Sequence, residues 1–130
     1  MEFDLDGSRV FAATGGRRFA PGGNKTIVFL HGAGMDRTVW SFQARHFAAR
    51  GLAVLAPDFP GHGRSAGPPL PTVAALADWT IRALDALGVA NAVFAGHSMG
   101  ARVALEVAAR LGGAGRPDKN PGAEDTAGSL

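Results

Sequence analysis

Three short apolar runs constrain the fold of this chain more than any other feature. They read KTIVFL, LAVLAPD and NAVFA, and each is followed by a glycine-containing loop and then by an amphipathic segment. Short apolar runs of this kind are typical of strands buried on both faces of a parallel sheet. Helices that connect such strands by right-handed crossovers cover both faces of the sheet. The sequence therefore predicts an α/β fold in three layers, with a mostly parallel sheet.

A β-hairpin is predicted ahead of these units, because EFDL and RVFAAT flank the turn signal DGS. Helices are expected over residues 38–50, with Thr38 as N-cap, over residues 72–87, and from the last strand to about residue 111. The first helix is expected to bury an apolar face made of Val39, Trp40, Phe42, Phe47 and Ala48. Trp40 and Trp79 are interpreted as anchors of helix packing.

The chain divides into two parts of different composition. The 130 residues suit one domain with a modest core, and residues 1–111 carry the periodic apolar pattern. Residues 112–130 contain five glycines and two prolines, and their only large apolar residue is Leu130. Such a segment buries too little surface to offset the entropy of ordering it. We therefore predict a disordered tail over residues 112–130.

Composition excludes several classes of protein. The chain has no cysteine, a net charge of +2 and scattered arginines, which argues against thiolate chemistry and against a nucleic-acid partner. Its start, MEFDLDGSRV, lacks the basic and apolar regions of a signal peptide, and no apolar run approaches the length of a membrane span. The four histidines are dispersed without a metal-binding spacing. We expect a cytoplasmic protein that uses no metal or organic cofactor and no membrane partner.

The GHSMG segment at residues 96–100 lies between the third apolar run and the last helix. A strand that turns abruptly into a helix strains its central residue and needs small neighbours on both sides. The hydroxyl of Ser98 would then project at the carboxyl end of the strand, beside the free amides of the helix N-terminus. This pattern favours a nucleophilic serine. The alternative is a glycine-rich turn in which Ser98 only caps the helix.

A second loop favours the nucleophile. His31 and Gly32 follow the first parallel strand directly, and Gly32 allows the backbone to approach a substrate closely. The amide of Ala33 could then point to the same position as the amide of Met99. Two such donors form an oxyanion hole, which stabilises the charge of a tetrahedral intermediate.

Three segments in order, HGAGMDRTVW, DFPGHGRS and GHSMG, resemble the N-terminal half of the α/β-hydrolase fold family. The similarity is closest to its lactonase, esterase and cofactor-independent haloperoxidase-like branch, and it covers residues 2–111. The resemblance implies that Ser98 is the nucleophile in the hydrolysis of a small-molecule carboxylic ester or lactone through an acyl-enzyme. It also implies that the backbone amides of Ala33 and Met99 form the oxyanion hole.

The same resemblance assigns roles to residues around the site. His31, Asp58 and His62 would be structural and hold the loops. Phe59 and Met99 would line part of the pocket, which favours an apolar substrate.

A dinucleotide site is the competing interpretation of the first loop. Gly32 and Gly34 follow a strand, and Asp58 ends the next strand, about where a ribose-binding acid would lie. The fingerprint requires a glycine where Arg37 stands, and the helix begins too late to hold a pyrophosphate. This interpretation also leaves Ser98 unexplained.

The general base is missing from the expected place. In the α/β-hydrolase family the chain order is serine, acid and histidine, but all four histidines of this chain precede Ser98. We therefore expect a fragment truncated after the helix that follows Ser98, without the acid and histidine of the triad and inactive alone. Substitution by His62 or His31 stays open, as do a non-catalytic remnant or interaction module and one half of a split enzyme.

Truncation at this point has a structural consequence. The run NAVFA would become an unpaired edge of the sheet, and an exposed apolar edge favours pairing with another chain. A chain that is marginally stable, or that self-associates through this edge, is therefore expected.

Overall fold

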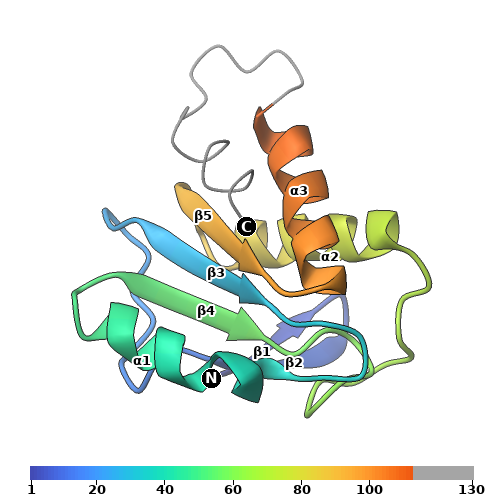
Figure 1. The fold of residues 1–130 in the computed structure, drawn as a ribbon, viewed down its shortest axis with the longest axis horizontal. Helices are drawn as coiled ribbons and strands as arrows, with labels where there is room; N and C mark the ends of the chain where they lie inside the picture. Colours follow the sequence, from blue (N-terminus) through green and yellow to red (C-terminus); the bar gives the residue numbers. More distant parts are fainter. Residues whose placement is uncertain (113–130) are drawn as a thin grey trace.

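In the computed structural model, which describes residues 1–112, five strands form a mixed sheet in the order β1-β2-β4-β3-β5 (Figure 1). The strands are β1 (Glu2–Leu5), β2 (Ser8–Ala13), β3 (Thr26–Leu30), β4 (Ala53–Pro57) and β5 (Ala92–Gly96). β1 and β2 form the predicted hairpin, and β2 runs antiparallel to β4. β4, β3 and β5 are parallel, with β3 between the other two. The carboxyl ends of these parallel strands therefore meet at one edge of the sheet.

Helices cover both faces of the sheet, as predicted. They are the 3-10 helix η1 (Arg37–Trp40) and the α-helices α1 (Ser41–Ala48), α2 (Val73–Ala86) and α3 (Met99–Gly112). α1 lies on one face, and α2 and α3 lie side by side on the other (Figure 1). The predicted three-layer α/β architecture, with a largely parallel sheet after the hairpin, is confirmed.

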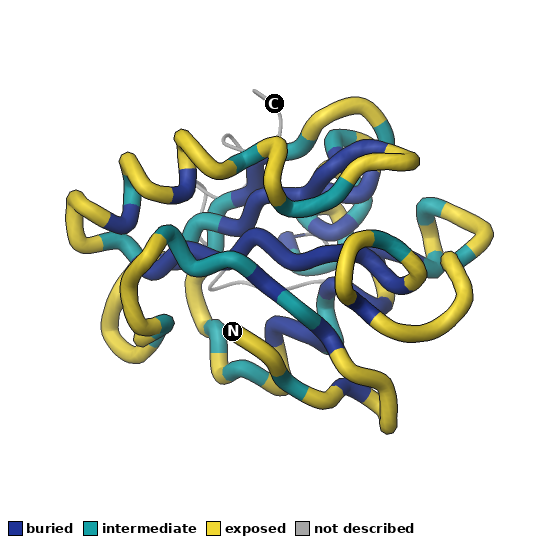
Figure 2. The backbone as a smooth tube through the Cα atoms, turned by 90° about the horizontal axis from the view of Figure 1, so that it is seen from below, coloured by how far each residue is buried: buried dark blue, intermediate teal, exposed yellow. Residues whose placement is uncertain are grey.

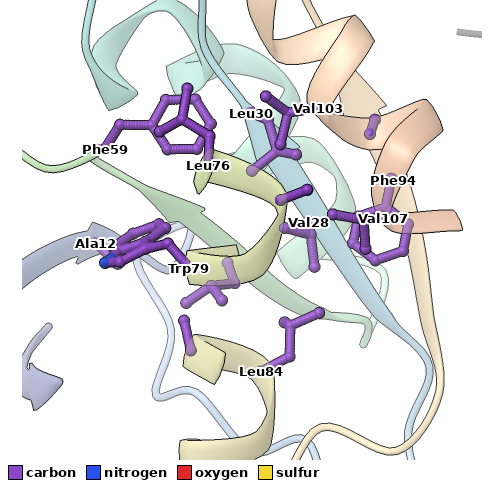
Figure 3. Packing of buried hydrophobic residues seen from close by; sticks show 14 of the residues in the cluster. Ala12, Val28, Leu30, Phe59, Leu76, Trp79, Leu84, Phe94, Val103 and Val107 are labelled. Atoms are coloured by element: carbon purple, nitrogen blue, oxygen red, sulfur yellow. The ribbon is translucent and has the colours of Figure 1, made fainter. Parts of the chain in front are cut away.

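The larger core lies between the sheet and the pair α2 and α3. It joins Val28 and Phe94 of the sheet to Trp79 of α2 and Val103 of α3, as Figure 3 shows. A smaller cluster under α1 surrounds Phe29. The central strands β3 and β4 are accordingly buried along most of their length, whereas β1, the loops and the outer helix faces are largely exposed (Figure 2).

Both tryptophans pack against buried aromatic rings. The Trp40 ring lies 4.9 Å from the Phe29 ring, and the Trp79 ring lies 5.8 Å from the Phe59 ring and nearly perpendicular to it. Such tilted and edge contacts are the preferred geometry of aromatic pairs. The predicted packing role of the tryptophans is confirmed.

The first helix departs from the prediction at its start. Asp36, not Thr38, is the N-cap, and its carboxylate accepts hydrogen bonds from both the amide and the hydroxyl of Thr38. The helix opens as a 3-10 turn with three residues per turn, so residues before and after Ser41 do not share one face. Val39 is 45% exposed and Phe42 is 89% exposed. The expectation that both belong to the buried face was wrong.

The predicted tail lies outside the described residues except for Gly112, which is the last residue of α3. No helix within residues 1–112 has the length and hydropathy needed to cross a membrane.

Candidate functional site

Ser98 occupies a strained position between β5 and α3. β5 ends at Gly96, and α3 begins at Met99. The backbone of Ser98 has a φ of +56°, in the left-handed region that residues with a side chain rarely adopt. The residue is exposed at the carboxyl end of β5, next to the N-terminus of a 14-residue helix. An exposed serine held in such a conformation fits the predicted abrupt turn.

The two glycines around Ser98 are required by close backbone contacts. A Cβ atom on Gly96 would overlap the backbone of Gly100, and a Cβ atom on Gly100 would overlap the carbonyl groups of Leu30 and His31. α3 therefore starts directly on top of the end of β3. The predicted need for small residues on both sides of the serine is confirmed for this turn.

The loop after β3 lies beside the Ser98 turn. Leu30 and Gly96 are register partners, and the amide of His97 donates a hydrogen bond of 3.1 Å to the carbonyl of Leu30. Further along, a Cβ atom on Gly32 would lie 3.3 Å from the carbonyl oxygen of His97. Gly32 thus allows the two loops to approach each other closely, which brings the next residue, Ala33, toward the turn.

The amides of Ala33 and Met99 have no acceptor among residues 1–112. Ala33 is exposed, and Met99 is the first residue of α3, where helix amides lack partners within the helix. Free amides at a helix start carry partial positive charge and attract anions. Both amides are therefore available to a bound group at this edge of the sheet.

Asp58 fixes the loop after β3 to the loop after β4. Its fully buried carboxylate accepts hydrogen bonds from the amide of Arg37 at 2.7 Å, from the Arg37 guanidinium at 2.8 Å and from the amide of Arg64 at 2.9 Å. The guanidinium groups of Arg37 and Arg64 both lie over the ring of Phe11. Charged hydrogen bonds of this kind are among the strongest in proteins. Asp58 is structural here, as expected.

Sequence reasoning missed Arg37 and Ser65. The hydroxyl of Ser65, nearly buried, donates to the carbonyl of Asp58 at 2.7 Å and accepts from the amide of Phe11 at 3.0 Å. In the sequence, Arg37 is notable only because it stands where a dinucleotide fingerprint requires a glycine. No local sequence pattern marks Arg37 as the partner of a carboxylate 21 residues away. Ser65 could have been found, because it ends the DFPGHGRS segment that resembles the family.

His31 uses both ring nitrogens inside the protein. Its Nδ1 lies 2.8 Å from the carbonyl oxygen of Gly32, and its Nε2 accepts a hydrogen bond of 3.0 Å from the amide of Phe59. The ring is therefore neutral, with its proton on Nδ1. Burial lowers the pKa of His31 below its ordinary value of 6.5. A fully buried ring with both nitrogens engaged cannot accept a proton from Ser98.

The other histidines are not joined to Ser98 either. The Nδ1 of His62 lies 3.0 Å from the carbonyl oxygen of Pro60, and its ring packs 5.1 Å from that of His31. His46 contacts Arg50 on the exposed side of α1. Within residues 1–112, no side chain forms a hydrogen bond with the Ser98 hydroxyl.

Phe59 does not line a pocket. Its side chain is fully buried and packs 4.7 Å from the ring of His31. The ring belongs to the larger core, where it also packs against the ring of Trp79. The expectation that Phe59 contacts substrate was wrong, and Met99, which is half-buried, keeps that role as a prediction.

A family model described as the alpha/beta hydrolase family matches residues 27–126, which contain the Ser98 turn and both neighbouring loops. The chain belongs to the alpha/beta hydrolase family. The identification confirms the resemblance inferred from the three segments. The match begins in β3 and does not include the β1–β2 hairpin.

Relatives in the alpha/beta hydrolase family cover much of the chain. A putative non-heme haloperoxidase of Mycobacterium phage D29 is 39% identical over 106 residues, which are 81% of this chain and 36% of that protein. A predicted CIB-like hydrolase from Thermoplasma acidophilum has a TM-score of 0.75 at 26% identity, covering 86% of this chain and 56% of that one. The enol-lactonase from Burkholderia xenovorans has a TM-score of 0.74 at 28% identity, covering 86% and 42%.

The chain spans about a third or less of the length of the curated relatives it matches. The part of the family model that this chain matches, residues 27–126, holds the GHSMG turn and the loop after β3. By name, one of these relatives is a hydrolase, one is an enol-lactonase and one is a putative haloperoxidase.

Proposed function

We propose that Ser98 is the nucleophile of a serine hydrolase that acts on small carboxylic esters or lactones. The observation that carries this proposal is the positive φ of Ser98 in a turn whose glycines admit no side chain. A strained backbone conformation costs free energy and persists only where the surrounding structure holds it. Residues in such conformations cluster at active sites. The lactonase among the solved structures supports the substrate class.

The reaction follows from the groups around the turn. The Ser98 hydroxyl oxygen attacks the carbonyl carbon of the substrate, and a base must accept the hydroxyl proton. The negative charge then moves to the former carbonyl oxygen, where the amides of Ala33 and Met99 donate hydrogen bonds. As the tetrahedral intermediate collapses, the protonated base returns its proton to the leaving alkoxide. The alcohol of an ester departs, whereas the new hydroxyl of an opened lactone stays attached to the acyl group. Water then hydrolyses the ester bond between the acyl group and Ser98. Each donor of an oxyanion hole contributes about 3–4 kcal/mol to such a transition state.

The loop contacts support the placement of the Ala33 amide. Asp58 holds the amide and the guanidinium of Arg37, and Gly32 lies against the carbonyl of His97. The segment that carries Ala33 is therefore fixed at both ends. An oxyanion hole stabilises charge effectively when its donors are held in place before the reaction.

The 130 residues do not contain a base in the order that the family uses. All four histidines precede Ser98, and His31 is already engaged at both nitrogens. We infer that this polypeptide alone has no serine-dependent turnover, and that an active enzyme requires an acid and a histidine from residues outside this sequence. Removal of the histidine in serine proteases leaves only the residual rate due to the oxyanion hole and binding.

Hydrolysis of p-nitrophenyl acetate tests both parts of the proposal. We expect the wild-type chain and Ser98→Ala to give equal rates without added base. Imidazole supplied in solution would act as a diffusible base, and we expect it to accelerate the wild-type chain above the Ser98→Ala background. Equal rates in imidazole would contradict the role of Ser98 as nucleophile.

A serine-dependent rate without imidazole would overturn the inference that the chain is inactive alone. In that case His62→Gln identifies the base, because the Nδ1 of His62 faces Pro60 and only its Nε2 is left to act. His46→Gln is the matched control, since His46 lies on α1 and contacts Arg50.

A further inference from the structure

A cavity of about 170 Å³ lies between the β1–β2 hairpin, α2 and the loop of residues 58–72 that joins β4 to α2. The hairpin forms one edge of the sheet, and β2, β4 and β3 separate β1 from β5, where the Ser98 turn begins. No described residue that lines the cavity belongs to that turn or to the loop after β3. The cavity is therefore separate from the candidate active site.

The walls of the cavity are mainly apolar. Leu5 and Val10 of the hairpin, Leu70 of the loop and Trp79 of α2 line it, and all of these except Leu70 are nearly or fully buried. An apolar cavity of about 150 Å³ can hold a benzene molecule. The space beside α2 therefore suits one small ring.

The loop that forms one wall is held in place by its own contacts. A Cβ atom on Gly61 would lie 2.6 Å from the backbone nitrogen of Pro69, so the loop closes tightly on itself. The amide of Ala66 donates a hydrogen bond of 2.9 Å to the carbonyl of Arg9 on β2. A wall that is already ordered costs a ligand little conformational entropy on binding.

Trp79 presents an unpaired hydrogen-bond donor to the cavity. The residue is 6% exposed, and Figure 3 shows the nitrogen at the end of the indole ring that points away from α2. Within residues 1–112 this N–H has no acceptor. The enclosed side-chain polar atoms without a partner there are Thr26 Oγ1 and Trp40 Nε1. Because Trp79 Nε1 is not enclosed, it is open to the space that the ring lines, and a nearly buried indole N–H usually has a partner.

The charged groups at the mouth of the cavity are already paired. Asp6 in the hairpin turn forms an ion pair with Arg82 of α2, and the Nε of Arg82 lies 3.1 Å from the carboxylate of Asp78. Two carboxylates thus share one guanidinium, and their net negative charge disfavours an anionic ligand. A cationic ligand would have to compete with Arg82 for the carboxylates. A neutral ligand meets neither obstacle.

We propose that this cavity is an accessory binding site for a small neutral carbonyl compound with a single apolar ring. The ring takes the place of water against Leu5, Val10 and Trp79, and the carbonyl oxygen accepts the hydrogen bond from the Trp79 N–H. Burial of the ring supplies the favourable free energy, and the hydrogen bond selects a ligand that has an acceptor. The proposal does not rest on the chemistry of Ser98.

Proton–nitrogen correlation spectra of the labelled 130-residue chain test the proposal, with cyclohexanone as the probe. The chain has two tryptophans, so it gives two indole N–H peaks. Trp40→Phe leaves one of them, which assigns Trp79. We expect cyclohexanone to shift the Trp79 peak along a saturating curve. The Trp40 peak is the internal control and should not move, because Trp40 packs against Phe29 under α1 on the other face of the sheet.

Trp79→Phe tests the hydrogen bond, because it keeps an aromatic ring and removes the donor. The Kd for cyclohexanone, followed at the backbone amide of Gly67 in the cavity wall, should rise about fivefold. Trp40→Phe is the matched control and should leave the Kd unchanged. Cyclohexylammonium and cyclohexanecarboxylate carry the same ring with opposite charges, and both should bind more weakly than cyclohexanone.

A Trp79 peak that does not shift saturably overturns the proposal, since its N–H then binds only water. Equal shifts of both tryptophan peaks, an unchanged Kd in Trp79→Phe, or tighter binding of either charged analogue also overturn it. The wild-type titration decides the matter even where Trp79→Phe fails to fold.

Discussion

The backbone of Gly100 lies directly against the carbonyl group of Leu30, so α3 begins where β3 ends. Replacing a helical glycine by alanine usually stabilises a helix by up to about 1 kcal/mol. Here the added Cβ atom would meet fixed backbone, and we expect Gly100→Ala to lower the free energy of unfolding by about 1–3 kcal/mol. Gly22→Ala is the control, because a Cβ atom at Gly22 contacts nothing within 4 Å. Urea unfolding of both variants measures the difference, and a neutral Gly100→Ala would contradict the close contact.

Ser98 is strained, and its removal should show this. At a φ of +56° glycine is favoured over residues with a Cβ atom, so Ser98→Gly should be more stable than Ser98→Ala by about 1 kcal/mol. Ala109→Gly is the control, at an exposed position of α3. There the alanine chain should be the more stable one, because glycine in a helix costs about 1 kcal/mol relative to alanine. Equal stability of Ser98→Gly and Ser98→Ala in thermal unfolding would argue against strain in the turn.

Breaking the buried ion pair of Asp58 and Arg37 should lower the free energy of unfolding more than breaking an exposed ion pair of the same kind. Asp58 is fully buried and Arg37 is 18% exposed at its side chain, so Asp58→Asn leaves a positive charge largely without a partner. We expect a loss of about 2 kcal/mol or more. Asp78→Asn is the control, because Asp78 and Arg82 form an exposed pair on α2, and we expect a change within about 0.5 kcal/mol. Similar losses in both variants would contradict the role assigned to Asp58.

The lowered pKa of His31 predicts how the free energy of unfolding depends on pH. Because burial lowers its pKa below 6.5, the unfolded chain binds a proton at His31 more readily than the folded chain does. The contribution of neutral His31 to the free energy of unfolding is therefore complete above pH 6.5. It is lost as the pH falls from 6.5 to the pKa that His31 has in the folded chain. Asp36 does not affect this range. Hydrogen bonds from Thr38 lower its pKa below 3.8, so its contribution to the free energy of unfolding is lost only below pH 3.8.

Chemical unfolding between pH 7.5 and 5.5 measures this effect. We expect His31→Gln to be less stable overall but to lose less stability across this range than the wild-type chain. Phe42→Gln, a change at an exposed and non-titrating residue of α1, should keep the wild-type slope. A wild-type slope in His31→Gln would show that another group titrates.

Much of the fold could be predicted from the sequence because strand burial and turn chemistry act locally. The apolar runs and the GHSMG turn identified β3, β4, β5 and the start of α3, and the helix expected from residue 72 is α2, with Thr72 as its N-cap. The start of α1 could not be predicted, because Asp36 and Thr38 are both good N-caps and tertiary contacts decide between them. Exposure of Phe42 follows from the 3-10 turn before Ser41, which shifts the phase of the helix.

The residues proposed to react with substrate could be predicted from the sequence, but the contacts that support them could not. Residue type and spacing pointed to Ser98 and to the loop that carries Ala33. The two hydrogen bonds of His31 and the burial of Phe59 depend on how the loop after β4 folds back on β3. Such contacts join residues about 28 positions apart, and no local periodicity reports them.

The site of acetylation tests the central claim most directly. The wild-type chain is treated with p-nitrophenyl acetate in imidazole, quenched in acid and digested, and the acetylated residue is identified by mass spectrometry. The account predicts that acetyl accumulates on Ser98 well above the exposed serines Ser8 and Ser41, and that unfolding in urea abolishes this preference. Equal acetylation of Ser98, Ser8 and Ser41 in the folded chain would contradict the account.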